Sequence, residues 1–315
     1  MSISVLGAGA FGTALAISLA RDGRPVTLWA RDPGDMQEKR QNTRRLPGCE
    51  FPDSVIATGD LAKAAKADVL LLAVPMQQLA GFLDTHHVLL AGKTLVACCK
   101  GVDLASGHGP AEIIRSKISN ATPAILSGPS FAVDIAGGLP TALTLACENG
   151  EDLQQMLSTD NLRIYRSSDL VGVEIGGALK NVVAIACGIA MGAGLGESAR
   201  AALMTRGYAE MKRFAVAQGA EPETLAGLSG FGDLALTCAS EKSRNFAFGF
   251  ALGRSEFLPE ETTVEGKATA KAVSALARAQ GLDMPIADMV VAVLDKHLTI
   301  KEAAEALLTR PLKEE

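Results

Sequence analysis

A single lysine interrupts the most apolar stretch of this 315-residue sequence. Lys180 is the only charged residue between Glu174 and Glu197, and glycine and aliphatic residues make up most of its surroundings. Burial disfavours the charged form of an amine, so an enclosed lysine must be paired or must exchange its proton near neutral pH. Such a lysine is suited to supply the proton for a carbonyl under reduction. The alternative is an ammonium that reaches water along its own aliphatic chain, but a helix that is apolar on all sides offers no short route.

Further polar residues lie where the ligands of a parallel sheet are expected. Lys100 follows an expected strand at residues 95–99, and the segment 127–132, with the sequence Ser-Gly-Pro-Ser-Phe-Ala, follows another at 124–126. The carboxyl ends of parallel strands form the ligand-binding edge of an open sheet, so both segments are predicted to lie on the cofactor side. Their small residues also allow a close approach of backbone to ligand.

Two strings in the second half complete the candidate site. Asp233 follows Gly-Phe-Gly and is a candidate for orienting Lys180. Ser243, Arg244 and Asn245 combine a hydroxyl, a guanidinium fork and an amide, which are groups that suit a phosphate. These residues favour a substrate that carries a phosphate.

Near the N-terminus, the string Gly-Ala-Gly-Ala-Phe-Gly at residues 7–12 follows an expected strand and opens an expected amphipathic helix at residues 13–21. In this pattern Gly7 permits a tight turn, Gly9 lets the backbone approach a pyrophosphate, and Gly12 lets helix and strand pack closely. The helix N-terminus then presents unpaired N–H groups to the phosphates. The strand, turn and helix together indicate a dinucleotide site rather than a purely structural glycine turn.

The residue after the second expected strand bears on the choice of cofactor. Folds specific for NAD usually offer a carboxylate to the ribose hydroxyls at this point, but here Arg31 precedes Asp32. A guanidinium can pair with a 2′-phosphate, so NADPH is predicted to be preferred, while Asp32 leaves NADH acceptable. The alternative is that Arg31 is an ordinary solvated surface residue.

Two kinds of architecture must position these groups. In the first half, short apolar runs alternate with helical patterns, at residues 3–6, 26–30, 55–57, 69–74, 95–99, 124–126 and 142–146, and a further run at 162–165 is expected to close the domain. The alternation indicates βαβ units, and the unbroken apolar runs indicate strands covered on both faces. After residue 169, Ala-rich windows such as 199–218 and 266–280 have helical periodicity. We predict an α/β fold, with a Rossmann-type doubly wound parallel sheet in a domain of residues 1–168 and an all-helical domain of residues 169–315.

Composition excludes several classes of partner. The net charge of −5 argues against nucleic acid and against a polybasic membrane surface. The six cysteines form no C-x-x-C pair, and the adjacent His86 and His87 have no third ligand at a suitable spacing, so no metal site is predicted. Without a signal-peptide pattern, we expect a cytoplasmic protein. Residues 175–196 are apolar enough to raise the question of membrane insertion, but Lys180 favours a buried helix.

Taken together, the motifs resemble those of the bacterial-type NAD(P)-dependent glycerol-3-phosphate dehydrogenases. The resemblance covers nearly the whole chain and rests on the number and order of the strings rather than on one of them. The strings are residues 7–12, Asn42 with 46–48, 100–101, 127–132, 177–184, 229–238, 243–245 and 264–266.

This resemblance implies interconversion of dihydroxyacetone phosphate and sn-glycerol 3-phosphate, which supplies glycerophospholipid synthesis. Lys180 would accept the proton in the oxidation of glycerol 3-phosphate, with Asn181, Asp233 and Thr237 around it. Further residues that the resemblance places against substrate are Lys100, Gly128, Ser130, Ser243, Arg244 and Asn245, the last three at its phosphate. The resemblance and the glycine motif together also imply a set of contacts to NADPH or NADH. These residues are Gly7, Gly9, Ala10, Phe11, Gly12, Arg31, Lys100, Ala132, Arg244, Thr263 and Glu265.

The departures from the family pattern are modest, and two alternatives remain. Arg45, Phe231 and Asp134 differ from the usual residues, but none removes a chemical group from the site. A β-hydroxyacid dehydrogenase would share the glycine turn and the buried lysine, although the Ser-Arg-Asn string favours phosphate. A catalytically silent dinucleotide sensor is the second alternative, which intact Lys180 and Asp233 disfavour. The sequence leaves the oligomeric state open, with a homodimer compatible with it.

Overall fold

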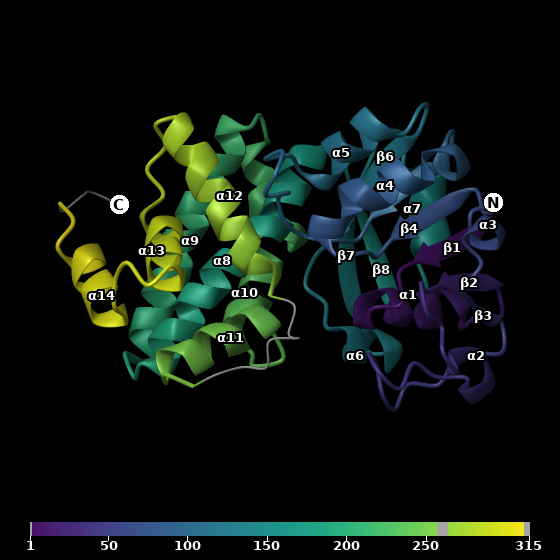
Figure 1. Ribbon diagram of the computed structural model, residues 1–315, viewed down its shortest axis with the longest axis horizontal. Coiled ribbons are helices and arrows are strands. Elements are labelled where there is room, and N and C mark those ends of the chain that lie inside the picture. The colour runs from purple at the N-terminus through teal and green to yellow at the C-terminus, as the bar shows by residue number, and fades with distance from the viewer. Residues whose placement is uncertain (1, 257–263, 312–315) are drawn as a thin grey trace.

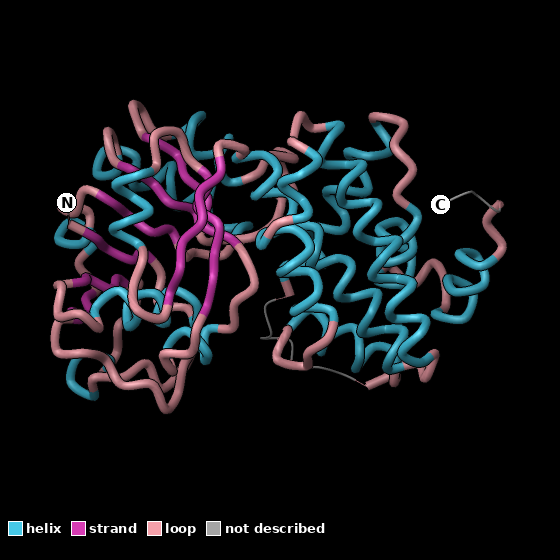
Figure 2. Tube along the Cα trace, turned by 180° about the vertical axis from the view of Figure 1, so that it is seen from behind, coloured by secondary structure: helices cyan, strands magenta, loops and turns pink. Residues whose placement is uncertain are grey.

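The structure of the protein, a computed structural model, describes residues 2–256 and 264–311 (Figure 1). Within these residues, a sheet with flanking helices occupies the first half of the chain, and the second half is helical (Figure 2). The predicted fold class is confirmed. Strand β8 (Leu162–Ser167) ends and helix α8 (Leu170–Gly192) begins next to the predicted boundary, but the division into two domains at residue 168 stays a prediction.

The sheet has eight strands in the order β3-β2-β1-β4-β5-β6-β7-β8. The other strands are β1 (Ile3–Leu6), β2 (Val26–Trp29), β3 (Val55–Thr58), β4 (Val69–Leu72), β5 (Thr94–Ala97), β6 (Thr122–Ser127) and β7 (Thr141–Ala146). Each overlaps one of the predicted apolar runs. The winding reverses between β1 and β4, and doubly wound sheets bind their ligands in the crevice that such a reversal opens at the carboxyl ends of the strands.

The direction of β7 departs from the prediction of a parallel sheet. Strands β1 to β6 are parallel, but β7 pairs antiparallel with β6, with Ser127 opposite Thr144. A connection between parallel strands must bring the chain back along the length of a strand, to the end of the sheet at which that strand began, usually by a helix. The connection here contains only the five-residue helix α6 (Ala132–Ala136), which is too short for that return. The chain therefore re-enters the sheet from the end at which it left.

Helices cover both faces of the sheet. They are α1 (Ala10–Ala20), α2 (Met36–Lys39), α3 (Leu61–Ala64), α4 (Met76–Leu90), α5 (Pro110–Lys117), α6 and α7 (Glu151–Leu157). The expectation that the first helix is amphipathic was wrong, because residues 12–20 are all buried. Helix α6 packs against α1 and so covers a side that would otherwise face solvent.

The second half consists of helices around α8. They are α9 (Gly196–Ala217), a 3₁₀ turn at Pro222–Ala226, a π-type turn at Leu228–Gly232, α10 (Asp233–Cys238), α11 (Arg244–Gly253), α12 (Glu265–Ala279), α13 (Pro285–Leu294) and α14 (Ile300–Leu308). Helix α8 is long and apolar enough to cross a membrane, with a mean hydropathy of 1.6, but 89% of that window is buried inside the protein. It is the core helix that the sequence predicted.

Helix α8 belongs to two hydrophobic cores. Its first residues, Leu170 and Val173, pack into the core on one face of the sheet, together with Leu95 and Ile125. From Ile175 onward its apolar residues form the core of the helical half. Asp169 caps its N-terminus by accepting a hydrogen bond from the Gly172 N–H at 2.7 Å.

Glycines bring α8 and α11 into backbone contact. A Cβ at Gly188 would overlap the carbonyl oxygen of Phe246, and a Cβ at Gly249 would overlap that of Ile185. Gly192 and Gly253 repeat the arrangement one turn further along. The abundant glycine of the sequence is thus used here for close helix packing rather than for flexibility.

Candidate active site

Lys180 lies in the middle of α8 and is only 8% exposed. Its ammonium donates to Thr237 Oγ1 at 2.8 Å and lies 3.1 Å from Asp233 Oδ1. Asp233 and Thr237 are four residues apart on α10, so they present their side chains on one face. The buried lysine is therefore both paired and enclosed.

Asp233 joins the two halves of the chain. Its Oδ2 lies 2.5 Å from the ammonium of Lys100, which also donates to the carbonyl oxygen of Gly128 at 3.2 Å. Lys100 follows β5, whereas Asp233 begins α10. We call Lys100, Asp233 and Lys180 the lysine–aspartate cluster, and all three were predicted site residues.

The cluster sets the protonation of its members. Burial lowers the pKa of Lys180 from 10.5 to about 8, although the Asp233 carboxylate opposes this shift and Lys100 adds to it. Burial alone would raise the pKa of Asp233, but the ammonium groups of Lys100 and Lys180 hold that pKa below its usual value. Lys180 can therefore gain or lose a proton near pH 8 beside a carboxylate that stays ionised.

A tight turn delivers Asp233 to α8. Gly230, in the π-type turn before α10, has no room for a Cβ because the backbone of Leu225 lies against it. On α8, a Cβ at Gly176 would lie 2.8 Å from the carbonyl oxygen of Ser229. Two glycines thus allow the turn to rest on the helix one turn before Lys180. The sequence showed these glycines but not their contact.

The end of β6 forms a second wall of the site. Gly128 has φ +144, which favours glycine, and its carbonyl oxygen accepts from Ser130 Oγ at 3.2 Å as well as from Lys100. Next to it, Ser127 is buried, and its Oγ has no hydrogen-bond partner among the described residues. That hydroxyl lies against Gly177, where a Cβ would be 2.5 Å from it. The sequence placed Ser127 in a motif but gave it no role.

The predicted phosphate residues lie at the start of α11. Ser243 caps this helix, and its hydroxyl accepts from the Phe246 N–H at 3.2 Å. Arg244 follows and is exposed. Asn245 donates to Asn181 Oδ1 at 2.8 Å and accepts from the Gly266 N–H at 3.0 Å. Asn245 therefore ties α11 to α8, one residue beyond Lys180, and to α12.

The glycine turn after β1 is tightly packed at its two ends and open at Gly9. Gly7 has φ +120, and a Cβ there would lie 2.6 Å from the carbonyl oxygen of Ala73. Gly12 packs against Gly7 and has no space for a side chain, whereas a Cβ at Gly9 would meet no atom within 4 Å. Gly9 directly precedes α1, whose first residues Ala10 and Phe11 are partly exposed. These residues fit the pyrophosphate of a nicotinamide dinucleotide.

The remaining predicted cofactor residues come from several different elements. Arg31 is exposed after β2 and donates to Gln78 Oε1 at 3.5 Å. Ala132 begins α6. Glu265 begins α12 and accepts a hydrogen bond from the backbone N–H of Met76. Its pKa is raised by burial, which Arg244 opposes. Thr263 lies outside the described residues.

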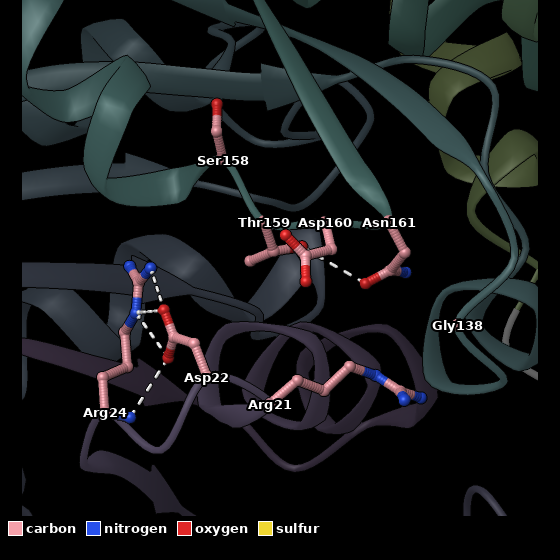
Figure 3. Close-up of a pocket in the computed structure, with 8 residues that line it drawn as sticks. All are labelled: Arg21, Asp22, Arg24, Gly138, Ser158, Thr159, Asp160 and Asn161. Atoms are coloured by element: carbon pink, nitrogen blue, oxygen red, sulfur yellow. Dashed lines mark hydrogen bonds and ion pairs between the residues drawn. The ribbon is translucent and has the colours of Figure 1, made fainter.

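A cavity of about 490 Å³ lies away from this site, where the C-terminus of α1 meets the loop before β8 (Figure 3). Arg24 in its wall is paired with Asp22 at 2.5 Å, and Asp160 and Asn161 also line the cavity. None of the predicted site residues lines it. Within the described residues, no group of three or more His, Cys, Asp or Glu side chains is placed to hold a metal ion.

Comparison with known proteins gives the family of the chain. Residues 2–153 match the family described as NAD-dependent glycerol-3-phosphate dehydrogenase N-terminus, and residues 169–305 match its C-terminus. The chain belongs to this family. The glycerol-3-phosphate dehydrogenase [NAD(P)+] of Ruegeria sp. (strain TM1040) is 62% identical over 321 residues, which cover 100% of both chains. The resemblance stated from the motifs is confirmed.

Solved structures agree with this assignment. The crystal structure of glycerol-3-phosphate dehydrogenase from Coxiella burnetii has a TM-score of 0.93 and 36% identity, and the match covers 98% of this chain and 99% of that one. The structure of the yeast glycerol-3-phosphate dehydrogenase GPD1 has a TM-score of 0.84 at 23% identity, and it supports the fold alone. The dinucleotide turn and the lysine–aspartate cluster are therefore features of a chain in the NAD-dependent glycerol-3-phosphate dehydrogenase family.

Proposed function

We propose that this member of the glycerol-3-phosphate dehydrogenase family interconverts dihydroxyacetone phosphate and sn-glycerol 3-phosphate with NADPH or NADH. The observation that carries the proposal is the buried Lys180, whose pKa is lowered to about 8 and which shares Asp233 with Lys100. A carbonyl reduction needs a proton donor of this kind in an enclosed site.

In the reducing direction, a bound NADPH or NADH would supply the hydride for the carbonyl carbon of dihydroxyacetone phosphate. Protonated Lys180 donates a proton to the oxygen that was the carbonyl, which gives the hydroxyl of glycerol 3-phosphate. In the oxidising direction, neutral Lys180 takes that proton back. Thr237 and Asp233 hold the Lys180 side chain in place through contacts of 2.8 and 3.1 Å.

Asp233 also has an electrostatic role in this proposal. Two ammonium groups close together in a buried site would each disfavour the charge of the other. The Asp233 carboxylate lies between them, 2.5 Å from the Lys100 ammonium and 3.1 Å from that of Lys180, and offsets this repulsion. Lys100 can then bind a substrate oxygen, with Gly128 and Ser130 as its neighbours on the sheet side.

The phosphate of the substrate is assigned to the start of α11. Arg244 is exposed there and offers a guanidinium fork, with Ser243 and Asn245 beside it. Asn181 aligns Asn245 through their 2.8 Å hydrogen bond. This arrangement would place the phosphate near Asn181, the residue that follows the proton donor on α8.

The cofactor is assigned to the turn of Gly7, Gly9 and Gly12 with Ala10 and Phe11. Arg31, Ala132, Glu265 and Thr263 are the further proposed contacts, and Lys100 and Arg244 would lie between cofactor and substrate. The partner is thus a small molecule rather than nucleic acid. We also propose that the enzyme is soluble and cytoplasmic, without membrane insertion, and that it supplies glycerol phosphate to phospholipid synthesis. A homodimer is compatible with this proposal.

The decisive experiment follows the nicotinamide absorbance of purified protein with NADPH and with NADH. Dihydroxyacetone phosphate is compared with carbonyl substrates of hydroxyacid type, which carry a carboxylate. We expect turnover with the phosphate substrate and little with the carboxylates. The reverse preference would support a β-hydroxyacid dehydrogenase, and cofactor binding without turnover would support a silent sensor.

A further inference from the structure

We propose that Arg44, together with Arg31, forms the subsite for the 2′-phosphate of NADPH and thereby determines cofactor specificity. The inference rests on the proposed function only in taking NADPH as a ligand of the turn at Gly7. Arg44 lies outside the sequence motifs, and only its position in space brings it to the end of β2.

The loop that carries Arg44 is fixed to the dinucleotide turn. Asn42 is 3% exposed, and its amide donates to the carbonyl oxygen of Ala8 at 2.9 Å and to Thr13 Oγ1 at 2.9 Å. Four residues later, Leu46 is 1% exposed, and its N–H donates to the carbonyl oxygen of Asn42 at 2.9 Å. Arg44 stands midway between these two anchored residues, so its backbone has a defined place beside the phosphate-binding turn.

The electrostatics at this point explain why a second cation is needed. Asp32 follows Arg31, and its carboxylate is exposed at the place where the adenosine ribose is expected. A bare carboxylate there would repel a 2′-phosphate. One guanidinium nitrogen of Arg44 lies 4.0 Å from Asp32 Oδ2 and so offsets that charge. Arg31, Asp32 and Arg44 together carry a net charge of +1, since there are two guanidinium groups and one carboxylate.

Both arginines retain capacity to bind an anion. The Arg44 side chain is 77% exposed, and its ion pair at 4.0 Å engages one side of a group with five N–H donors. Arg31 makes a 3.5 Å contact with Gln78 that a phosphate can replace. Arg44 beside Asp32 and Arg31 next to it in sequence offer two guanidinium forks, which suit a dianionic phosphate better than a ribose hydroxyl.

The test separates the adenosine end of the cofactor from catalysis. Binding of 2′,5′-ADP and of 5′-AMP is measured by calorimetry on the wild-type protein, on Arg44→Ala and on Arg45→Ala. Arg45 is the matched control, because it is the next residue, is also exposed, and has no ion pair with Asp32 among the described residues. We expect Arg44→Ala to weaken 2′,5′-ADP about 10-fold, the scale of a charge-assisted contact partly screened by solvent. Binding of 5′-AMP should change less than about twofold for either variant.

Equal effects of Arg44→Ala on the two nucleotides, or no effect on either, would overturn the inference. The same holds if Arg45→Ala weakens 2′,5′-ADP as much as Arg44→Ala does. Steady-state reduction of dihydroxyacetone phosphate with NADPH and NADH distinguishes this failure from that of the proposed function. If the wild-type enzyme is active but Arg44→Ala binds 2′,5′-ADP as the wild type does, only the proposed subsite is refuted. If the protein is inactive but binding of 2′,5′-ADP depends on Arg44, only the proposed activity is refuted.

Discussion

At the scale of single residues, Lys180 is the group whose removal should affect chemistry most. Lys180→Met keeps the length and the apolar packing of the side chain and deletes its proton. We expect NADPH binding, measured by fluorescence, and circular dichroism to be unchanged. Turnover with dihydroxyacetone phosphate should fall by about 10²–10⁴-fold, the usual contribution of a positioned acid. Near-normal turnover would show that another group supplies the proton.

The pKa of Lys180, about 8, also predicts opposite pH profiles for the two directions. Reduction needs the ammonium, so kcat should fall as the pH rises through about 8. Oxidation needs the neutral amine, so kcat should rise over the same interval. Asp233→Asn removes the charge that favours the ammonium, and Lys100 still disfavours it, so both profiles should move to lower pH. Profiles that do not move in that variant would assign the titration to a different group.

Arg244 gives a test of the phosphate assignment. Arg244→Lys retains the charge but loses the fork, so the Michaelis constant for dihydroxyacetone phosphate should rise. Arg244→Ala should raise it further, by about 10- to 100-fold, the equivalent of one hydrogen bond to a charged group. Unchanged kinetic constants in Arg244→Ala would move the phosphate elsewhere, with Lys100 the next candidate.

Replacing the buried Ser127 with alanine should make the protein more stable. Its buried hydroxyl has no partner among the described residues, so Ser127→Ala removes an unpaired polar group. We expect the free energy of unfolding to rise by about 1 kcal/mol in denaturant titrations. Ser18→Ala is the control, because that buried hydroxyl bonds Thr159 at 3.0 Å and Asn161 at 2.9 Å and its loss should destabilise. Destabilisation by both changes would mean that Ser127 has a partner in solution.

At the scale of elements, the contact between α8 and α11 should tolerate no side chain at its glycines. Gly249→Ala places a methyl group on the backbone of Ile185 and should destabilise the protein by about 2–3 kcal/mol in urea unfolding. Gly81→Ala is the matched control, since Gly81 lies within α4 and a Cβ there meets no atom within 4 Å. That change should stabilise by about 0.5–1 kcal/mol. If both substitutions changed the free energy of unfolding in the same way, helix propensity rather than packing would determine their effect.

The elements were also what the sequence predicted best. Every run predicted as a strand overlaps a strand of the structure, because strands covered on both faces, such as β1 and β4, are apolar along their length. The direction of β7 was missed, since it depends on how far α6 can carry the chain. The buried state of α1 was missed as well, because it depends on α6 lying over it. Both errors concern contacts between elements, which periodicity within one element cannot reveal.

The same reason limits what could be predicted of the candidate site. The isolation of Lys180 in an apolar helix is a local property, and the sequence displayed it. The motif also suggested that Asp233 orients Lys180, but the contact of the same carboxylate with Lys100, across 133 positions of sequence, exists only in the folded chain. The unpaired hydroxyl of Ser127 and the approach of Arg44 to Asp32 were invisible for the same reason.

At the scale of the whole molecule, the course of α8 bears on motion. A hinge needs a few loop residues that absorb large changes of φ and ψ. Here only residues 168–169 separate β8 from the 23-residue helix α8. The first turn of α8 packs in the core against the sheet, and the rest of the helix forms the core of the helical half. Rotation of one half against the other would tear Leu170 and Val173 from their packing. We therefore expect substrate capture to proceed by movements of side chains and short loops, and small-angle scattering profiles to be the same with and without ligands.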